Sequence, residues 1–139
     1  GLRMERVCDN AKTLAQFFAT EYSDIEVNYP GLAGSKWHNI ATEQFGDKFG
    51  GIITIRTGNK KRAFGIIDAL KLPLIVSNIG DTKTLVIHPE STLNVHSTQE
   101  EKETAGVFDD LIRISVGIED IEDLIDDFKQ AIESVKDVY

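Results

Sequence analysis

Apolar and polar residues alternate along this chain with two periods, one typical of helices and one typical of strands. Apolar residues at every third or fourth position predict amphipathic helices over residues 2–21 and 118–135. Acidic residues of the run 119–127 are predicted to form the solvated face of the last helix. The inward stripes are Met4, Val7, Ala11, Leu14 and Phe18 in the first helix, and Ile118, Ile121, Leu124, Ile125, Phe128, Ile132 and Val135 in the last.

Three shorter helices are predicted from the residues that can cap their first turns. Ser35 can cap a helix through Phe45, and Asn59 can cap a helix over 60–70. The segment 97–101 offers a capping box for a further short helix. The inward residues are expected to be Trp37, Ile40 and Ala41 in the first of these helices, and Ala63, Phe64, Ile67 and Leu70 in the second.

Runs rich in β-branched residues predict five strands, two of them on either side of a turn at Gly80-Asp81. Strands interleaved with helices predict an α/β sandwich, in which helices cover a small sheet. We find no repeat, linker or low-complexity tract, so residues 1–139 are expected to form a single domain. The predicted strands are 25–29, 50–57, 74–79, 83–88 and 111–116.

The composition is that of a soluble globular domain, with 41% hydrophobic and 27% charged residues. The net charge of -8 argues against binding to nucleic acid or to an anionic membrane surface, because both would repel the chain. No run approaches the roughly 18 apolar residues that span a bilayer, and no signal peptide is visible. The single cysteine, Cys8, cannot form an internal disulfide, which favours a reducing cytoplasm.

Arg113 is the most informative charged residue, because it interrupts an apolar strand. Alternation over 111–116 places it on one face with Leu111 and Ser115, and places the isoleucines beside it on the other face. An arginine in this setting is costly to bury without an anion, and its planar fork fits a carboxylate through two parallel hydrogen bonds. The alternatives are a surface arginine on an edge strand and a member of a structural ion pair.

Four segments, in order along the chain, carry a family resemblance. They are GLRMER at 1–6 followed by Asn10 and Ala11, NYPGL at 28–32, NIGDTKTLVIHP at 78–89 and DLIRISVGIEDIEDLIDDFKQAI at 110–132. Together they resemble the pyridoxal-phosphate (PLP)-dependent enzymes of Cys/Met metabolism. The resemblance covers nearly the whole chain.

The resemblance implies the small C-terminal domain of aspartate-aminotransferase-like (fold type I) PLP enzymes, with a mostly antiparallel sheet. Family members are longer, and the abrupt start at Gly1 suggests a piece of such an enzyme. An absent N-terminal domain would then bind the PLP, so this chain alone is expected to be inactive. The intact enzyme is expected to be a cytoplasmic homotetramer that acts on a small amino-acid substrate. Arg113 would bind the α-carboxylate of that substrate.

Asn78 is the second candidate substrate-binding residue. Its position before Gly80 is typical of a turn residue, whereas relatives often have Ser here, in a Ser-Leu-Gly motif that touches the substrate carboxylate. Asn-Ile-Gly resembles the O-acetylhomoserine sulfhydrylase branch, which replaces acetate with sulfide or a thiol. Ser77 stands where cystathionine synthases often have Glu. Methionine gamma-lyase and cystathionine synthase or lyase remain alternatives within the family, and an amino-acid-binding regulatory module or a purely structural domain remain alternatives outside it.

We expect no catalytic, cofactor-binding or metal-binding residue in this chain. None of the ten lysines lies in the sequence context of the family's cofactor lysine, and no Gly-rich phosphate loop is present. Cys8 and the three histidines lack the close spacing of metal ligands. His88 belongs to a His-Pro-Glu-Ser-Thr segment that resembles the family's His-Pro-Ala-Ser-Thr, with Glu90 in place of Ala. We expect His88 to be a hydrogen-bonded histidine at the end of a strand.

Overall fold

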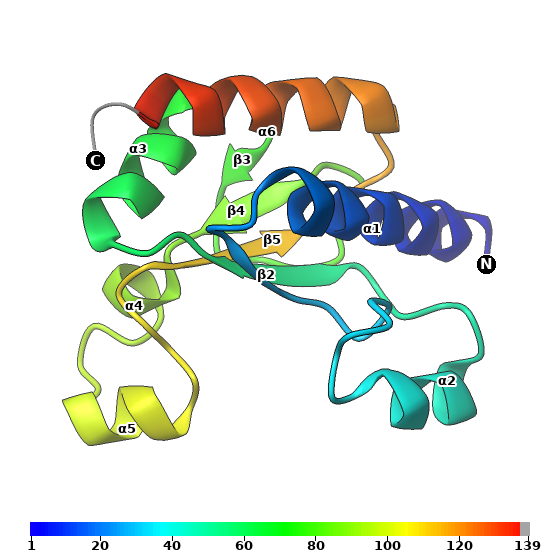
Figure 1. The fold of residues 1–139 in the computed structure, drawn as a ribbon, viewed down its shortest axis with the longest axis horizontal. Coiled ribbons are helices and arrows are strands. Elements are labelled where there is room, and N and C mark those ends of the chain that lie inside the picture. The colour runs from blue at the N-terminus through cyan, green and yellow to red at the C-terminus, as the bar shows by residue number, and fades with distance from the viewer. Residues whose placement is uncertain (137–139) are drawn as a thin grey trace.

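Three helices pack together on one face of a five-stranded sheet (Figure 1). They are α1 (Leu2–Glu21), α3 (Lys60–Ala69) and α6 (Ile121–Val135). The computed structural model describes residues 1–136. The cap predicted at Asn59 forms, and its side chain accepts a hydrogen bond from the Arg62 N–H, whereas the cap predicted at Ser35 does not, because α2 begins only at His38 with Trp37 as its N-cap. No helix in this part of the chain combines the length and the apolar content that a membrane span needs.

The sheet is mostly antiparallel, as the family resemblance implies. In the order β1-β2-β5-β4-β3, only the pair β3–β4 is parallel. The strands are β1 (Glu26–Asn28), β2 (Ile52–Arg56), β3 (Leu74–Ile75), β4 (Leu85–Ile87) and β5 (Leu111–Ser115). The fold class predicted from the sequence is therefore confirmed.

The two strands predicted on either side of Gly80-Asp81 are both present, but they are shorter than the predicted ranges 74–79 and 83–88. β3 is only two residues long and runs parallel to β4, with Leu74 opposite Leu85. The backbone groups of residues 77, 78 and 80 hydrogen-bond to side chains of β5 instead of to a neighbouring strand. Side-chain contacts across the sheet thus end the strand early.

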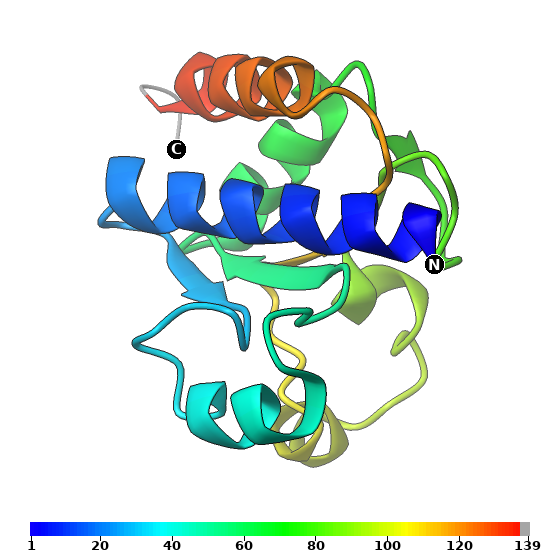
Figure 2. The ribbon, with the colours of Figure 1, turned by 90° about the vertical axis from the view of Figure 1, so that its right-hand side faces the viewer.

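The two faces of the sheet differ in what covers them. Ile53, Ile55, Val86, Ile112 and Ile114 point into the core beneath the helix layer and are fully buried. The other face carries the polar residues of β1, β2 and β5, and the smaller helices lie on that side (Figure 2). The alternation predicted for β5 is therefore confirmed, with its isoleucines in the core. The smaller helices are α2 (His38–Phe45), α4 (Pro89–Thr92) and α5 (Gln99–Thr104).

Several side chains predicted to point inward do not. Trp37 and Ile40 are 52% and 54% exposed, and only Ala41 of that predicted set is buried. The reason is that α2 stands away from the three-helix layer, where no core is available to it (Figure 2). Met4, Phe64 and Ile118 are also exposed, and Ile118 precedes α6. The capping box predicted for α5 is present between Thr98 and Glu101.

The acidic run 119–127 is not simply a solvated helix face, which corrects the sequence-based prediction. Asp127 is buried, and its carboxylate accepts hydrogen bonds from the backbone N–H groups of Lys71 and Leu72 at 2.9 and 2.8 Å. These bonds fasten the end of the α3 segment to α6. Asp120 caps α6 by accepting the N–H of Glu122.

Candidate carboxylate-binding site

Arg113 lies in the middle of β5, the central strand of the sheet, on the face opposite to the helix layer. Its cross-strand neighbours are Thr54 on β2 and Ile87 on β4. It is therefore not a surface residue on an edge strand, because strands flank β5 on both sides. Pairing on both sides holds the backbone of Arg113 in a rigid element, which is how binding side chains are best positioned.

The guanidinium group of Arg113 has hydrogen-bond partners but no counter-charge. Its Nη2 donates to the Ser77 carbonyl oxygen at 2.7 Å and to the Asn78 carbonyl oxygen at 3.3 Å. Its Nε is buried and has no hydrogen-bond partner within residues 1–136. None of the ion pairs formed by the described residues includes Arg113. Burial lowers the pKa of Arg113, but an arginine remains protonated, so the site holds an unpaired positive charge.

Residues 77–80, which we call the 77–80 loop, lie along Arg113 and Ser115. The Ser115 hydroxyl accepts a hydrogen bond from the Gly80 N–H at 3.0 Å. Gly80 has a φ of +75°, which favours glycine, and a Cβ there would meet no other atom. The loop thus brings Asn78 beside Arg113, as the sequence-based hypothesis requires, through its backbone carbonyl. The Asn78 residue itself is exposed.

The chain just after the 77–80 loop is anchored by a separate network on the turn between β5 and α6. The Glu119 carboxylate accepts from the backbone N–H and the hydroxyl of Thr84, at 2.6 and 2.9 Å. Thr84 Oγ1 accepts from the Gly117 N–H, and Asn10 on α1 donates to the carbonyl oxygens of Gly117 and Glu119. A Cβ at position 117 would clash with the Thr82 carbonyl oxygen, so glycine is required there. Glu119 is therefore structural rather than solvated.

Sequence reasoning missed three residues that support the site, namely Ser115, Glu119 and Asn10. All three lie inside the segments that carry the family resemblance, which is the only signal that could have drawn attention to them. Their partners are 35 to 109 residues away along the chain. No local pattern can predict such contacts.

An open hollow of about 850 Å³ lies over β1 and β2, and its lining includes neighbours of Arg113 but not Arg113 itself. Thr54 and Leu111, which flank Arg113 across the strand and along it, contribute to its lining, as does the exposed ring of Trp37. Arg56 also lines it, but its charge is balanced by Asp110 at 2.9 Å. Within the described residues, neither Arg113 nor the exposed Lys36, which lines the hollow beside the Trp37 ring, is in an ion pair, and of the two only Arg113 is partly buried.

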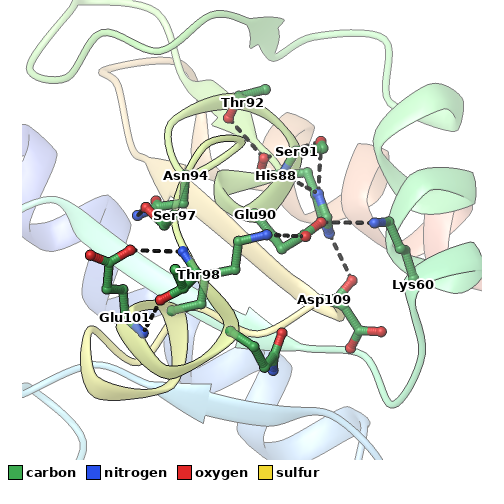
Figure 3. Close-up of polar contacts among 12 residues, drawn as sticks. Lys60, His88, Glu90, Ser91, Thr92, Asn94, Ser97, Thr98, Glu101 and Asp109 are labelled. Carbon is green, nitrogen blue, oxygen red and sulfur yellow. Dashed lines mark hydrogen bonds and ion pairs between the residues drawn. The ribbon is translucent and has the colours of Figure 1, made fainter.

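A second polar cluster surrounds α4 and is fully paired (Figure 3). The buried His88 ring bonds to the Ser91 hydroxyl through Nδ1 at 2.9 Å and to the Asp109 carbonyl oxygen through Nε2 at 2.7 Å. The expectation of a hydrogen-bonded histidine is therefore confirmed. Glu90 accepts from Lys60 at 2.8 Å and from Lys102 at 2.7 Å, and these hydrogen bonds lower the pKa of Glu90 to about 2.

The described residues fit a carboxylate better than they fit PLP. PLP needs a lysine that is shielded from water and a cradle of free backbone N–H groups. No lysine within residues 1–136 is buried, and side chains already cap α3, α4, α5 and α6, while the uncapped first turns of α1 and α2 have no buried lysine beside them. In that same part of the chain no three His, Cys, Asp or Glu side chains lie close enough together to hold a metal ion.

Residues 1–133 match the protein family described as Cys/Met metabolism PLP-dependent enzyme. L-methionine gamma-lyase of Fusobacterium nucleatum subsp. polymorphum is 39% identical over 135 residues, which cover 96% of this chain and 34% of that protein. Homocysteine synthase of Schizosaccharomyces pombe is 41% identical over 133 residues, which cover 95% of this chain and 31% of that protein.

A solved structure is similar over nearly the whole chain. It is a putative O-acetylhomoserine (thiol)-lyase from Campylobacter jejuni that carries N'-pyridoxyl-lysine-5'-monophosphate. Its TM-score is 0.90 at 39% identity, and the match covers 95% of this chain and 32% of that one. The chain thus spans about a third of the length of the relatives it matches.

Proposed function

This chain belongs to the family of PLP-dependent enzymes of Cys/Met metabolism, and from that premise we propose that it is the substrate-carboxylate-binding part of an O-acetylhomoserine sulfhydrylase-type transferase. The complete polypeptide would replace the acetate of an activated homoserine with sulfide or a thiol. PLP, held by a part of the polypeptide outside this chain, would act as the electron sink for that chemistry. The role of this chain is to bind and orient the amino acid.

The observation that carries the proposal is the unpaired Arg113. Its Nε is buried without a partner, its Nη2 is held by two carbonyls, and it is in no ion pair with the described residues. A carboxylate placed against the Arg113 guanidinium group supplies the missing negative charge and accepts hydrogen bonds from it. Binding there fixes the amino acid in one orientation, so that the bond to be broken is aligned with the cofactor.

Two observations support the sulfhydrylase type of reaction. Ser77 carries no charge, so it cannot bind the amino group of a second amino acid as a glutamate would. The similar structure from Campylobacter jejuni is named as an O-acetylhomoserine (thiol)-lyase, and the similar protein from Schizosaccharomyces pombe as a homocysteine synthase. A small sulfur nucleophile is therefore the acceptor we propose.

The test uses the holoenzyme, meaning the complete PLP-loaded polypeptide that contains this chain. We expect it to convert O-acetylhomoserine and sulfide to homocysteine. It should act far more weakly on the carboxamide of O-acetylhomoserine, because a neutral amide cannot pair with Arg113. In the Arg113→Ala variant the acid and the amide should become nearly equal substrates. An undiminished preference for the acid in that variant would refute the role of Arg113.

Methionine gamma-lyase activity is the second candidate, favoured by the 39% identical relative of that name. Both reactions need the same carboxylate contact, so Arg113 does not distinguish them. The discriminating measurement is incubation of the holoenzyme with methionine alone. Release of a thiol at a rate similar to that of homocysteine formation would favour the lyase, whereas the sulfhydrylase should need an added sulfur nucleophile.

A further inference from the structure

Ser115 and Arg113 lie two positions apart on the same face of β5, and both hold the 77–80 loop. We propose that Ser115 is a positioning residue of the carboxylate site, which acts by keeping this loop against Arg113. The proposal rests on the proposed function and extends it to a residue that does not itself touch the substrate.

Within the described residues, the Ser115 hydroxyl forms a hydrogen bond to this loop and to no other group. Ser115 is 3% exposed, and its Oγ accepts the Gly80 N–H at 3.0 Å. Its backbone stands in register with Ile52 on one side and with Leu85 on the other, so the pairing of β5 does not depend on the hydroxyl. Burying a hydroxyl is unfavourable unless it is hydrogen-bonded. The bond to the loop is therefore what the serine contributes.

The two β5 side chains bind backbone groups of opposite polarity in the loop. Arg113 donates to the carbonyl oxygens of residues 77 and 78, whereas Ser115 accepts from the N–H of Gly80. A shift of the loop by one residue would place an N–H against the guanidinium donors or a carbonyl against the serine lone pairs. The pair of contacts thus selects one register of the loop, and with it one position of Asn78.

Loss of the Ser115 hydroxyl should loosen the site more than the fold. The Gly80 N–H would lose its partner, and the carbonyls that orient Arg113 would become mobile. The chain beyond the loop would remain anchored, because Thr84 is held independently by Glu119 and Gly117. Arg113 would then have to be ordered when substrate binds, and that ordering weakens binding.

The experiment compares Ser115→Ala with a matched variant, Thr57→Val, in the holoenzyme. Thr57 is also a buried hydroxyl, but it bonds to the carbonyls of Asn59 and Asp110, away from the 77–80 loop. Steady-state kinetics gives KM and kcat for O-acetylhomoserine. Deuterium uptake by peptides covering residues 76–82 reports the loop without reference to activity.

For Ser115→Ala we expect KM to rise roughly 5- to 10-fold, the effect of losing one buried hydrogen bond, with kcat changed by less than about twofold. Uptake at 76–82 should accelerate. Thr57→Val should change neither KM nor the deuterium uptake at 76–82. Ser115→Thr, which keeps the hydroxyl, should have a KM close to that of the wild type. Should Ser115→Ala fold poorly, Ser115→Cys keeps the size with a weaker acceptor and should also raise KM.

Wild-type KM and wild-type uptake in Ser115→Ala would overturn the proposal. An equal rise of KM in Thr57→Val would also overturn it, since the effect would then follow any loss of a buried hydroxyl. Failure here is distinguishable from failure of the proposed function. If Arg113→Ala destroys turnover while Ser115→Ala has no effect, only the positioning role is wrong, whereas normal turnover in Arg113→Ala removes the carboxylate site itself.

Discussion

Arg113 and Glu90 are both partly buried charges on the side of the sheet away from the helix layer, but their surroundings differ. The Glu90 carboxylate lies 2.7 Å from the ammonium group of Lys102 and 2.8 Å from that of Lys60, and Figure 3 shows the pair with Lys60. Arg113 meets two backbone carbonyls and, within residues 1–136, no carboxylate. One charge is neutralised inside the chain and the other is not.

The difference separates a structural charge from a binding charge. Glu90 joins α3 to α5 through its ion pairs with Lys60 and Lys102, so residues of this chain neutralise its charge. A desolvated arginine without an anion is unfavourable by itself and becomes favourable when a carboxylate arrives. Substitution of Glu90 should therefore affect stability, and substitution of Arg113 should affect substrate binding.

Arg113→Ala should give the largest effect, a fall in kcat/KM of the holoenzyme corresponding to about 2–5 kcal/mol. The substrate carboxylate would then lie in a partly desolvated site without its partner. Arg113→Lys should recover only part of the loss, because a point charge cannot reproduce the planar fork. Steady-state kinetics with O-acetylhomoserine measures both variants.

Stability provides the control for Arg113. The thermal midpoint of Arg113→Ala should stay close to that of the wild type, because the anionic partner of the arginine comes with the substrate. A loss of activity that merely follows a large fall in the thermal midpoint would identify Arg113 as a structural residue and remove the contrast with Glu90.

Glu90→Ala should lower the free energy of unfolding by about 1–2 kcal/mol, since it leaves Lys102, whose side chain is only 13% exposed, without a counter-charge. Lys60 is 45% exposed and contributes less, because water screens its charge. Denaturant unfolding measures the change, with Glu100→Ala, which removes an exposed acid on α5, as the matched control. A rise in the KM for O-acetylhomoserine similar to that in Arg113→Ala would contradict the structural role.

The pH dependence of stability should reveal the ion pairs of Glu90 with Lys60 and Lys102. Because the pKa of Glu90 is lowered from its usual 4.5 to about 2, its ion pairs stabilise the fold fully above pH 4.5. That contribution is lost as the pH falls from 4.5 toward 2, when the carboxylate becomes protonated. Unfolding of wild type and Glu90→Gln across this range should show their stability difference shrinking as the pH decreases. A difference independent of pH would exclude the ion pairs as its source.

Asn78→Ser should have the smallest effect, a change in kcat/KM of less than about 1 kcal/mol. Arg113 contacts the backbone carbonyl of Asn78, which the substitution retains. Kinetics of the holoenzyme tests this expectation. A loss as large as that of Arg113→Ala would show that the Asn78 side chain, rather than its backbone, carries the contact.

The sequence by itself determined those features that depend on neighbours a few residues away. The cap of α3 at Asn59 and the capping box of Thr98 and Glu101 join residues three positions apart, so they are visible in the sequence. The alternation in β5 likewise predicted which of its residues share a face, and the face with the isoleucines is the one that lies in the core. The family resemblance added the mostly antiparallel sheet and the substrate α-carboxylate as the expected partner of Arg113.

Only the tertiary structure decided how distant segments meet. The parallel pairing of β3 with β4, the Ser115–Gly80 bond and the Asp127 anchor join residues between 11 and 56 positions apart. The exposure of Trp37 and Ile40 depends on where α2 lies relative to the core, which the period of a helix does not specify. Periodicity shows that a face is apolar or that a residue is charged. Whether that face meets a core, or that charge meets a counter-charge, is settled by packing between elements.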